Sequence, residues 1–197
     1  MNTLIEPIES AAQRDAATRI REEVFGREWR HQVTSPFEGS HAALHLLARS
    51  SPEGAAVATL SVVDTTADRN LHDSYGLAFD GRVKVARYTQ LAVLKPYRGM
   101  NLPLRLILEA HRRFVVPGHF AYTWLLYRPE HAAESSLCRL LGFQPGTGTF
   151  ESPYGPVRTL VRREAPAVAG EEIWRPQSPA GIAKTETVVS VFSSTAQ

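Results

Sequence analysis

Residues 91–103 read LAVLKPYRGMNLP, a stretch that joins an apolar strand to a basic turn and the start of a helix. The run Leu91–Leu94 is short and apolar, as in a buried strand, and Lys95–Tyr97 ends it with a proline. An amphipathic helix is predicted from about Leu102 or Pro103, because apolar residues then recur at helical spacing. The stretch therefore predicts a strand–turn–helix unit.

The turn of this unit has the chemistry of a phosphate-binding loop. A helix N-terminus exposes unpaired backbone N–H groups and about half a positive charge, so it attracts anions. Gly99 lets the backbone approach an anion closely, and Arg98 adds planar, charged donors. A plain turn without a ligand is the simpler interpretation, and these residues alone leave both readings open.

The remaining chain alternates between strand and helix patterns. Ser10 and Gln13 form a capping-box pattern, and the helix that follows is expected to end at Gly26. The region 65–81 is polar and irregular, and the strand that precedes the loop is expected to be irregular near 88–90. Predicted helices cover 11–25, 103–114 and 130–141, and predicted strands cover 3–9, 41–48, 55–63, 83–94, 120–127 and a hairpin within 143–163. This order predicts a mixed sheet with helices on both faces and a parallel strand pair beside the 103–114 helix.

Composition narrows the classes of function. The chain has 197 residues, a formal charge of +2 and one cysteine. We therefore expect no nucleic-acid partner, no internal disulfide and, without a long apolar run or a signal-peptide layout, no membrane span. A soluble cytoplasmic protein follows as the expectation, with one domain over 1–164 and an extended or mobile C-terminal extension over 165–197.

Two short motifs resemble the GNAT acyltransferase superfamily. Its acyl-CoA-binding loop is Arg-Gly-x-Gly-x-Gly/Ala between a strand and a helix, and residues 98–103 match its first half but place Asn101 and Pro103 where small residues are usual. Asn tolerates the left-handed conformation, whereas Pro removes one N–H donor. The second match is Leu141-Gly142-Phe143, which closes the predicted 130–141 helix as in many of these enzymes.

The resemblance covers about residues 3–164 and implies an α+β fold, an α/β/α sandwich with a mixed, mostly antiparallel sheet and a splayed parallel strand pair. It implies acetyl-CoA or another acyl-CoA as co-substrate, no metal, and a small-molecule amine as acceptor. A homodimer is plausible by the same resemblance. Donor binding is then assigned to Leu91, Ala92, Val93, Arg98, Gly99, Met100, Asn101, Leu102, Pro103 and His131.

The catalytic positions are less well matched. The resemblance places an oxyanion-binding backbone N–H near Val93. It places Cys138 where many GNAT enzymes carry a proton-donating tyrosine, although a small buried apolar residue is the simpler reading of that thiol. The usual glutamate base falls among residues 87–90, none of which is a carboxylate. A water relay through Thr89 or Gln90 is one alternative, and a base from Asp64, His72 or Asp73 is another.

Arg21, Val24, Phe25, Glu28 and Trp29 resemble a pattern of the acyl-homoserine-lactone and N-acyl amino acid synthases, which share the fold. That subgroup generally takes its acyl chain from the phosphopantetheine of an acyl carrier protein. Three hypotheses therefore stay open: acyl-CoA-dependent N-acylation of a small amine, the same chemistry with a carrier-protein donor, and a non-catalytic module that binds CoA or a partner protein.

Overall fold

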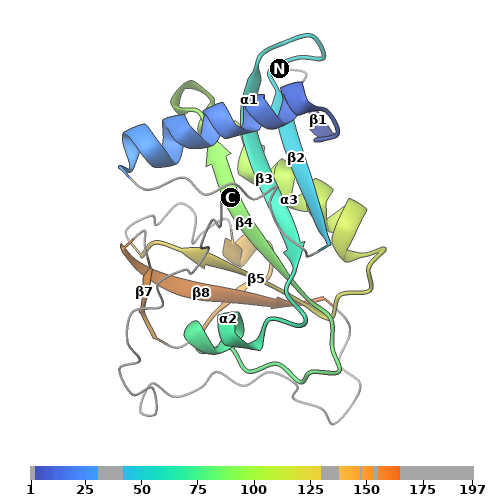
Figure 1. Cartoon of the computed structure of the whole chain (residues 1–197), viewed down its shortest axis with the longest axis vertical. Helices are drawn as coiled ribbons and strands as arrows, with labels where there is room; N and C mark the ends of the chain where they lie inside the picture. The colour runs from blue at the N-terminus through green and yellow to red at the C-terminus, as the bar shows by residue number, and fades with distance from the viewer. Residues whose placement is uncertain (1–2, 31–41, 130–137, 147, 153–154, 165–197) are drawn as a thin grey trace, which may run out of the picture.

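The computed structural model describes residues 3–30, 42–129, 138–146, 148–152 and 155–164 (Figure 1). The predicted helix over 130–141, with His131, and the predicted extension over 165–197 lie mostly or wholly outside these residues. No helix among them is long and apolar enough to cross a membrane.

A single mixed sheet forms the centre of the molecule. Its strand order is β1-β2-β3-β4-β5-β8-β6, with β7 paired to β8. Neighbouring strands run antiparallel except β4 and β5, which are parallel. The strands are β1 Leu4–Pro7, β2 Ala43–Arg49, β3 Ala56–Asp64, β4 Val85–Val93, β5 Tyr122–Tyr127, β6 Gln144–Pro145, β7 Phe150–Ser152 and β8 Gly155–Arg163.

Helices cover both faces of this sheet, as predicted. Figure 1 shows α1 crossing in front of the upper strands, α2 below it on the same side, and α3 behind the sheet. We call the front the α1 face and the back the α3 face. The helices are α1 Ala11–Arg21, which continues as the π-helix η1 Glu22–Glu28; α2 Arg69–Ser74; the 3-10 turn η2 Lys95–Tyr97; and α3 Leu102–Ala110, which continues as the π-helix η3 His111–Val115.

Apolar residues on each side of the sheet meet one of these helices. On the α3 face, Leu106 and Ile107 of α3 pack with Leu60 and Leu125 in the largest buried cluster. On the α1 face, Ile20 of α1 packs against Leu47 and Ala92. A third cluster joins α2 to β5 through Trp124. The mostly antiparallel sheet with helices on both faces confirms the predicted fold class.

Two local predictions were wrong. Gly26 does not end the first helix, because the chain continues through it as η1, and Arg30 with a φ of 56° follows the helix end at Trp29. The π-turn is closed by a hydrogen bond from the Trp29 N–H to the Val24 carbonyl, 3.1 Å long. The irregular region 65–81 contains α2, which is capped by Asp68 but has only six residues, too few for helical periodicity to be visible.

The irregularity predicted in the long strand is a β-bulge. Ser61 of β3 pairs with Thr89 and Thr59 pairs with Ala92, so β4 carries one extra residue between these pairs. Gln90 adopts a φ of 53° within the bulge. A bulge changes which face the following residues occupy, because side chains alternate along a strand. Val93 consequently joins the α3-face core, whereas Ala92 lies under α1.

Candidate functional site

β4 and β5 diverge from one another along their length. Pairing between them covers Val85–Arg87 and Tyr122–Trp124, whereas β4 continues to Val93 and β5 to Tyr127. Beyond this point β5 stays paired with β8, and β4 stays paired with β3. The two parallel strands are therefore splayed, as the resemblance implied, and we call this divergence the fork.

Backbone polar groups of β4 are directed into the fork. The Leu94 N–H donates to the Val57 carbonyl of β3 at 3.0 Å. Amide groups alternate in direction along an extended strand, so the N–H and carbonyl of Val93 are directed away from β3, toward β5. Val93 is thus placed where an oxyanion donor is expected, although the assignment itself remains a prediction.

The loop after β4 has the conformation that its residues predict. Gly99 has a φ of 86°, and a Cβ built on it meets nothing within 4 Å, so the dihedral angle rather than space favours glycine here. Asn101 is the N-cap of α3 in the left-handed conformation, with φ 56° and ψ 18°. Its side chain makes no capping hydrogen bond, and Pro103 stands in the first turn. The N-terminus of α3 is therefore not closed by its own cap residue.

Arg98 lies between this loop and the first helix. Its Nε donates to the Val93 carbonyl at 3.0 Å. Its Nη2 donates to Glu28 Oε2 at 2.7 Å, and 41% of the Arg98 side chain stays exposed. The predicted phosphate-binding arginine thus touches both the fork and η1.

The other predicted donor-binding residues differ in exposure. Leu91 packs at the edge of the α3-face core, and Ala92 and Leu102 are fully buried. Met100 is exposed at the tip of the loop. Ala92 and Leu102 therefore anchor the two ends of the loop in the core, whereas Met100 faces solvent.

A row of polar side chains crosses the α1 face beside Thr89. His45 Nδ1 lies 2.8 Å from Ser61 Oγ, and Arg21 Nη2 donates to Ser61 Oγ at 3.1 Å and Thr59 Oγ1 at 3.2 Å. Ser61 is also the cross-strand partner of Thr89. Sequence reasoning missed this row, although Thr59 and Ser61 in the middle of the mostly apolar β3 were a signal for it.

Burial sets the charge of two members of the row. It lowers the pKa of Arg21 to about 10, which leaves the guanidinium charged at neutral pH. Burial, followed by the positive charge of Arg21, lowers the pKa of His45 to about 4. His45 is therefore a neutral imidazole at pH 7 and adds no charge to the α1 face.

The low pKa of His45 predicts a dependence of stability on pH. The unfolded chain takes up a proton near pH 6.5 but the folded chain does not until about pH 4, so the free energy of unfolding falls as the pH drops between these values. We expect His45→Asn to reduce the stability lost between pH 7 and pH 5, measured by urea denaturation, by about 1 kcal/mol. The matched control, His119→Asn at an exposed position, should keep the wild-type loss. An identical loss of stability in both variants would contradict a half-buried, neutral His45 imidazole.

Of the remaining catalytic candidates, Cys138 and His72 are buried, Asp64 is half-buried and Asp73 is exposed. Cys138 is 4% exposed within the α3-face cluster, and its carbonyl accepts from the Phe143 N–H at 3.0 Å, just after Gly142 with a φ of 79°. This geometry confirms Gly142 as the helix cap. His72, a residue of α2, is buried, with its Nε2 3.1 Å from Thr65 Oγ1. Asp64 accepts from the Thr66 N–H at 2.9 Å.

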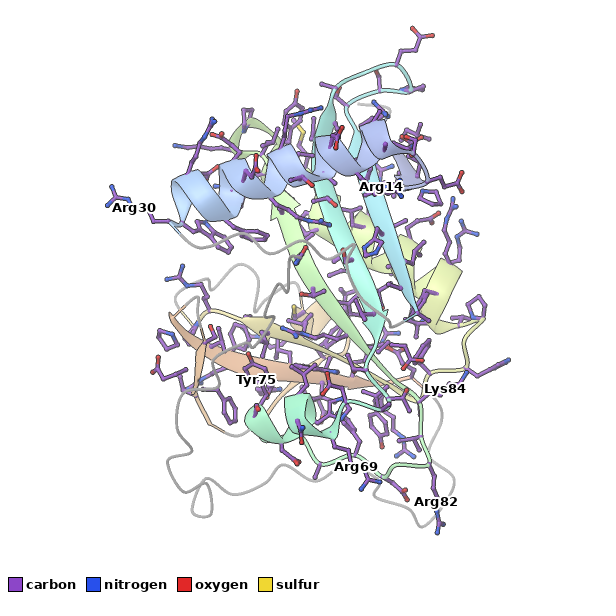
Figure 2. The ribbon with its side chains drawn as sticks, viewed as in Figure 1. Arg14, Arg30, Arg69, Tyr75, Arg82 and Lys84 are labelled. Carbon is purple, nitrogen blue, oxygen red and sulfur yellow. The ribbon has the colours of Figure 1, made fainter. Side chains whose placement is uncertain are left out.

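An arginine packed on aromatic rings marks the base of the fork. Arg87 and Trp124 are cross-strand partners at the last paired position, and the guanidinium lies 4.8 Å from the Trp124 ring centroid. Tyr75, labelled at the end of α2 in Figure 2, lies 5.9 Å from Trp124, centroid to centroid. The cation is thus fixed in position where β4 and β5 part.

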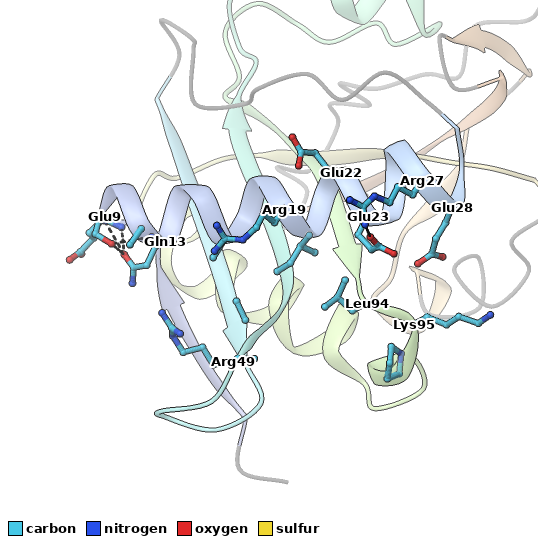
Figure 3. A pocket seen from close by; sticks show the side chains of 17 residues that line it. Glu9, Gln13, Arg19, Glu22, Glu23, Arg27, Glu28, Arg49, Leu94 and Lys95 are labelled. Carbon is cyan, nitrogen blue, oxygen red and sulfur yellow. Dashed lines mark hydrogen bonds and ion pairs between the residues drawn. The ribbon is translucent and has the colours of Figure 1, made fainter.

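A separate groove of about 1460 Å³ follows α1 (Figure 3). It extends from Glu9 to Glu28 and reaches the loop after β4 at Leu94–Pro96. Carboxylates and basic side chains both line it, so its charge favours neither sign. Among the described residues, no group of three His, Cys, Asp or Glu side chains is placed to hold a metal ion.

The splayed parallel pair, the bulge in its first strand β4 and the helices on both faces match the GNAT fold that the resemblance implied. No protein-family model and no curated protein sequence matches the chain. The chain does match solved structures. FeeM, an N-acyl amino acid synthase from uncultured soil microbes, shares 16% identity at a TM-score of 0.64, over 82% of this chain and 91% of its own.

Two further structures extend the likeness. Escherichia coli ElaA shares 15% identity at a TM-score of 0.62, over 82% of this chain and 99% of its own. Arabidopsis thaliana NAA60, solved in complex with acetyl-CoA, shares 14% identity at a TM-score of 0.61, over 82% of this chain and 98% of its own. At such identities the similarity establishes the fold, which confirms the resemblance at that level.

Proposed function

We propose that this chain is an N-acyltransferase that moves an acyl group, foremost acetyl, from acyl-CoA to the amine of a small molecule. The observation that carries the proposal is the fork, in which the Val93 amide group is directed toward β5 beside the Arg98 loop. The fold of structures such as NAA60 with acetyl-CoA supports the same donor class.

In this proposal the donor occupies the space between loop and fork. Its phosphates meet Arg98 and the N–H groups at the start of α3, of which Pro103 supplies none. The pantetheine arm lies along the Leu91–Val93 edge of β4. The Val93 N–H then donates to the thioester carbonyl and stabilises the negative charge that develops on its oxygen.

The acceptor enters from the α1 face and attacks directly. Its amine nitrogen bonds to the thioester carbon, the carbon–sulfur bond breaks, and the thiolate of CoA leaves and takes up a proton. Thr89 and the neighbouring row of Ser61 and His45 provide hydrogen-bonding groups through which water can carry the amine proton away. Holding both reactants in this geometry supplies most of the rate enhancement.

We expect Cys138→Ala to keep kcat within about twofold of wild type, because a thiol that is 4% exposed among core residues has no route to the leaving sulfur. The variant should lose about 1 kcal/mol of stability through the small cavity that it leaves. Release of free CoA measures the first effect, and urea denaturation measures the second. A tenfold fall in kcat at unchanged stability would instead make the thiol the proton donor.

A carrier-protein donor is the second candidate. The likeness to FeeM, an N-acyl amino acid synthase, favours it, as does the Arg21, Phe25 and Trp29 pattern. A phosphopantetheine on a carrier protein presents one phosphodiester rather than a pyrophosphate, so a loop with fewer N–H donors suffices. The non-catalytic binding module is the third candidate.

Calorimetric titration with acetyl-CoA, free CoA and a long-chain acyl-CoA tests the proposal, followed by CoA release with a panel of small amines. Micromolar binding of acetyl-CoA together with turnover supports N-acylation from acyl-CoA. Binding without turnover on any amine points to the binding module. Failure with every CoA species, with transfer from an acylated carrier protein, would replace the first candidate by the second.

A further inference from the structure

We infer that Glu28 is a positioning residue that competes with the donor phosphate for Arg98, so that donor binding releases the end of the first helix. The inference rests on the proposed donor site. It starts from a contact between segments that are 70 residues apart in the chain, the 2.7 Å hydrogen bond between Arg98 Nη2 and Glu28 Oε2.

The Glu28 carboxylate takes one of the N–H groups that Arg98 could offer to a phosphate. The guanidinium binds carboxylates and phosphates through the same planar set of N–H donors. Its Nε is already committed to the Val93 carbonyl, and Nη2 to Glu28. A phosphate that binds the other N–H groups of the same guanidinium must lie beside the carboxylate and be repelled by its negative charge, or displace it.

The helix geometry places Glu28 at this point. η1 turns less per residue than an α-helix, so its last residues face a direction that a regular continuation of α1 would not reach. Figure 3 shows Glu28 pointing from η1 toward the segment of Leu94 and Lys95. Glu23, one turn earlier, instead pairs with Arg27 at 2.8 Å on the same helix.

The next residue connects η1 to the other arm of the fork. The Trp29 ring packs on Phe25 at 5.1 Å between centroids, and the guanidinium of Arg128, directly after β5, lies 5.8 Å from the Trp29 ring centroid. Glu28 and Trp29 thus join η1 to the segments that follow β4 and β5. Release of Glu28 by a phosphate therefore changes a helix end on the α1 face, from which the acceptor enters in the proposed function.

Calorimetry on Glu28→Gln tests this competition. The variant keeps the size and hydrogen-bonding groups of the side chain but removes its charge, and it should bind CoA about threefold to fivefold more tightly than wild type, as expected for loss of a partly exposed ion pair. Pantetheine, which lacks every phosphate, should bind both proteins equally. Glu23→Gln removes the same charge from the same helix without contact to the loop and should bind CoA as wild type does.

Trp29 gives a second readout. CoA should change the tryptophan fluorescence of wild type, and Trp29→Phe should abolish that change. In Glu28→Gln the emission before CoA is added should already resemble that of CoA-bound wild type.

The outcomes separate the inference from the proposed function. Equal or weaker binding of CoA by Glu28→Gln, with wild type binding normally, overturns the inference and leaves the donor site intact. If Glu28→Gln binds CoA and pantetheine more tightly by the same factor, the inference is also overturned, because the phosphate is then not the group that competes with Glu28. Binding of CoA by Glu28→Gln but not by wild type supports the inference. Failure of both proteins to bind CoA overturns the inference and the CoA-dependent function together.

Discussion

Replacing Arg98 with alanine is expected to weaken CoA binding by about 10- to 100-fold. Charge-assisted hydrogen bonds to a phosphate contribute about 1.5–3 kcal/mol, and each 1.4 kcal/mol is a tenfold change in affinity. The substitution also removes the Nε hydrogen bond to the Val93 carbonyl, which leaves that part of the β4 edge less ordered. Calorimetric titration with CoA gives the dissociation constants directly.

Arg105→Ala is the matched control for this variant. Arg105 lies in the first turns of α3, directly after the loop that holds Arg98, but its guanidinium donates to the Thr3 carbonyl at 2.8 Å. Arg105→Ala removes the same charge from the helix that follows the loop and should change CoA affinity less than threefold. Arg98→Lys keeps the charge without the planar donors and should fall between wild type and alanine. Equal effects of Arg98→Ala and Arg105→Ala would contradict a specific role for Arg98.

Replacing Trp124 with alanine is expected to lower the free energy of unfolding by about 3–5 kcal/mol, the range for removal of a large buried aromatic side chain. Trp124 has no exposed surface, and its ring contacts His72 and Tyr75 at 5.9 Å between centroids. It also packs beneath the Arg87 guanidinium, which would lose its cation–π partner. Urea denaturation monitored by circular dichroism measures the change.

Trp124→Phe separates packing from hydrogen bonding at the same position. Phe keeps most of the ring but loses the hydrogen bond that Nε1 donates to Thr65 Oγ1 at 3.2 Å. We expect a loss of about 1–2 kcal/mol, well below that of alanine. A loss below 1 kcal/mol for alanine itself would mean that α2 and β5 are not held together by this ring.

Much of the fold follows from patterns within single segments. The capping box of Ser10 and Gln13 begins α1 as predicted, because both hydrogen bonds are made by residues of one turn. The strand–loop–helix around Arg98 is also as predicted. The end of the first helix was misplaced at Gly26, since a glycine inside a helix is disfavoured locally but tolerated when neighbouring residues are packed. Here Val24 is 2% exposed in the α1-face core.

The candidate site likewise combines residues that are adjacent in the sequence with residues that only the fold brings together. The residues of the fork edge and the loop are contiguous, so one resemblance locates them together. The row of His45, Ser61 and Thr89 comes from three strands, and nothing within any one strand shows which residues will be neighbours. The bulge in β4 adds to this difficulty, because one extra residue changes the face of every side chain after it.

The sequence by itself determined most of the strands, the capped start of the first helix, the left-handed turn at Gly99 and Asn101, and the basic charge of the loop, because each depends on a few adjacent residues. Only the tertiary structure decided that Glu28 meets Arg98 across 70 residues, and that the Val93 amide is directed into the fork. These depend on strand register, on the π-helical end of the first helix and on which strands stay paired. Those features are set by packing of the whole domain rather than by local preference.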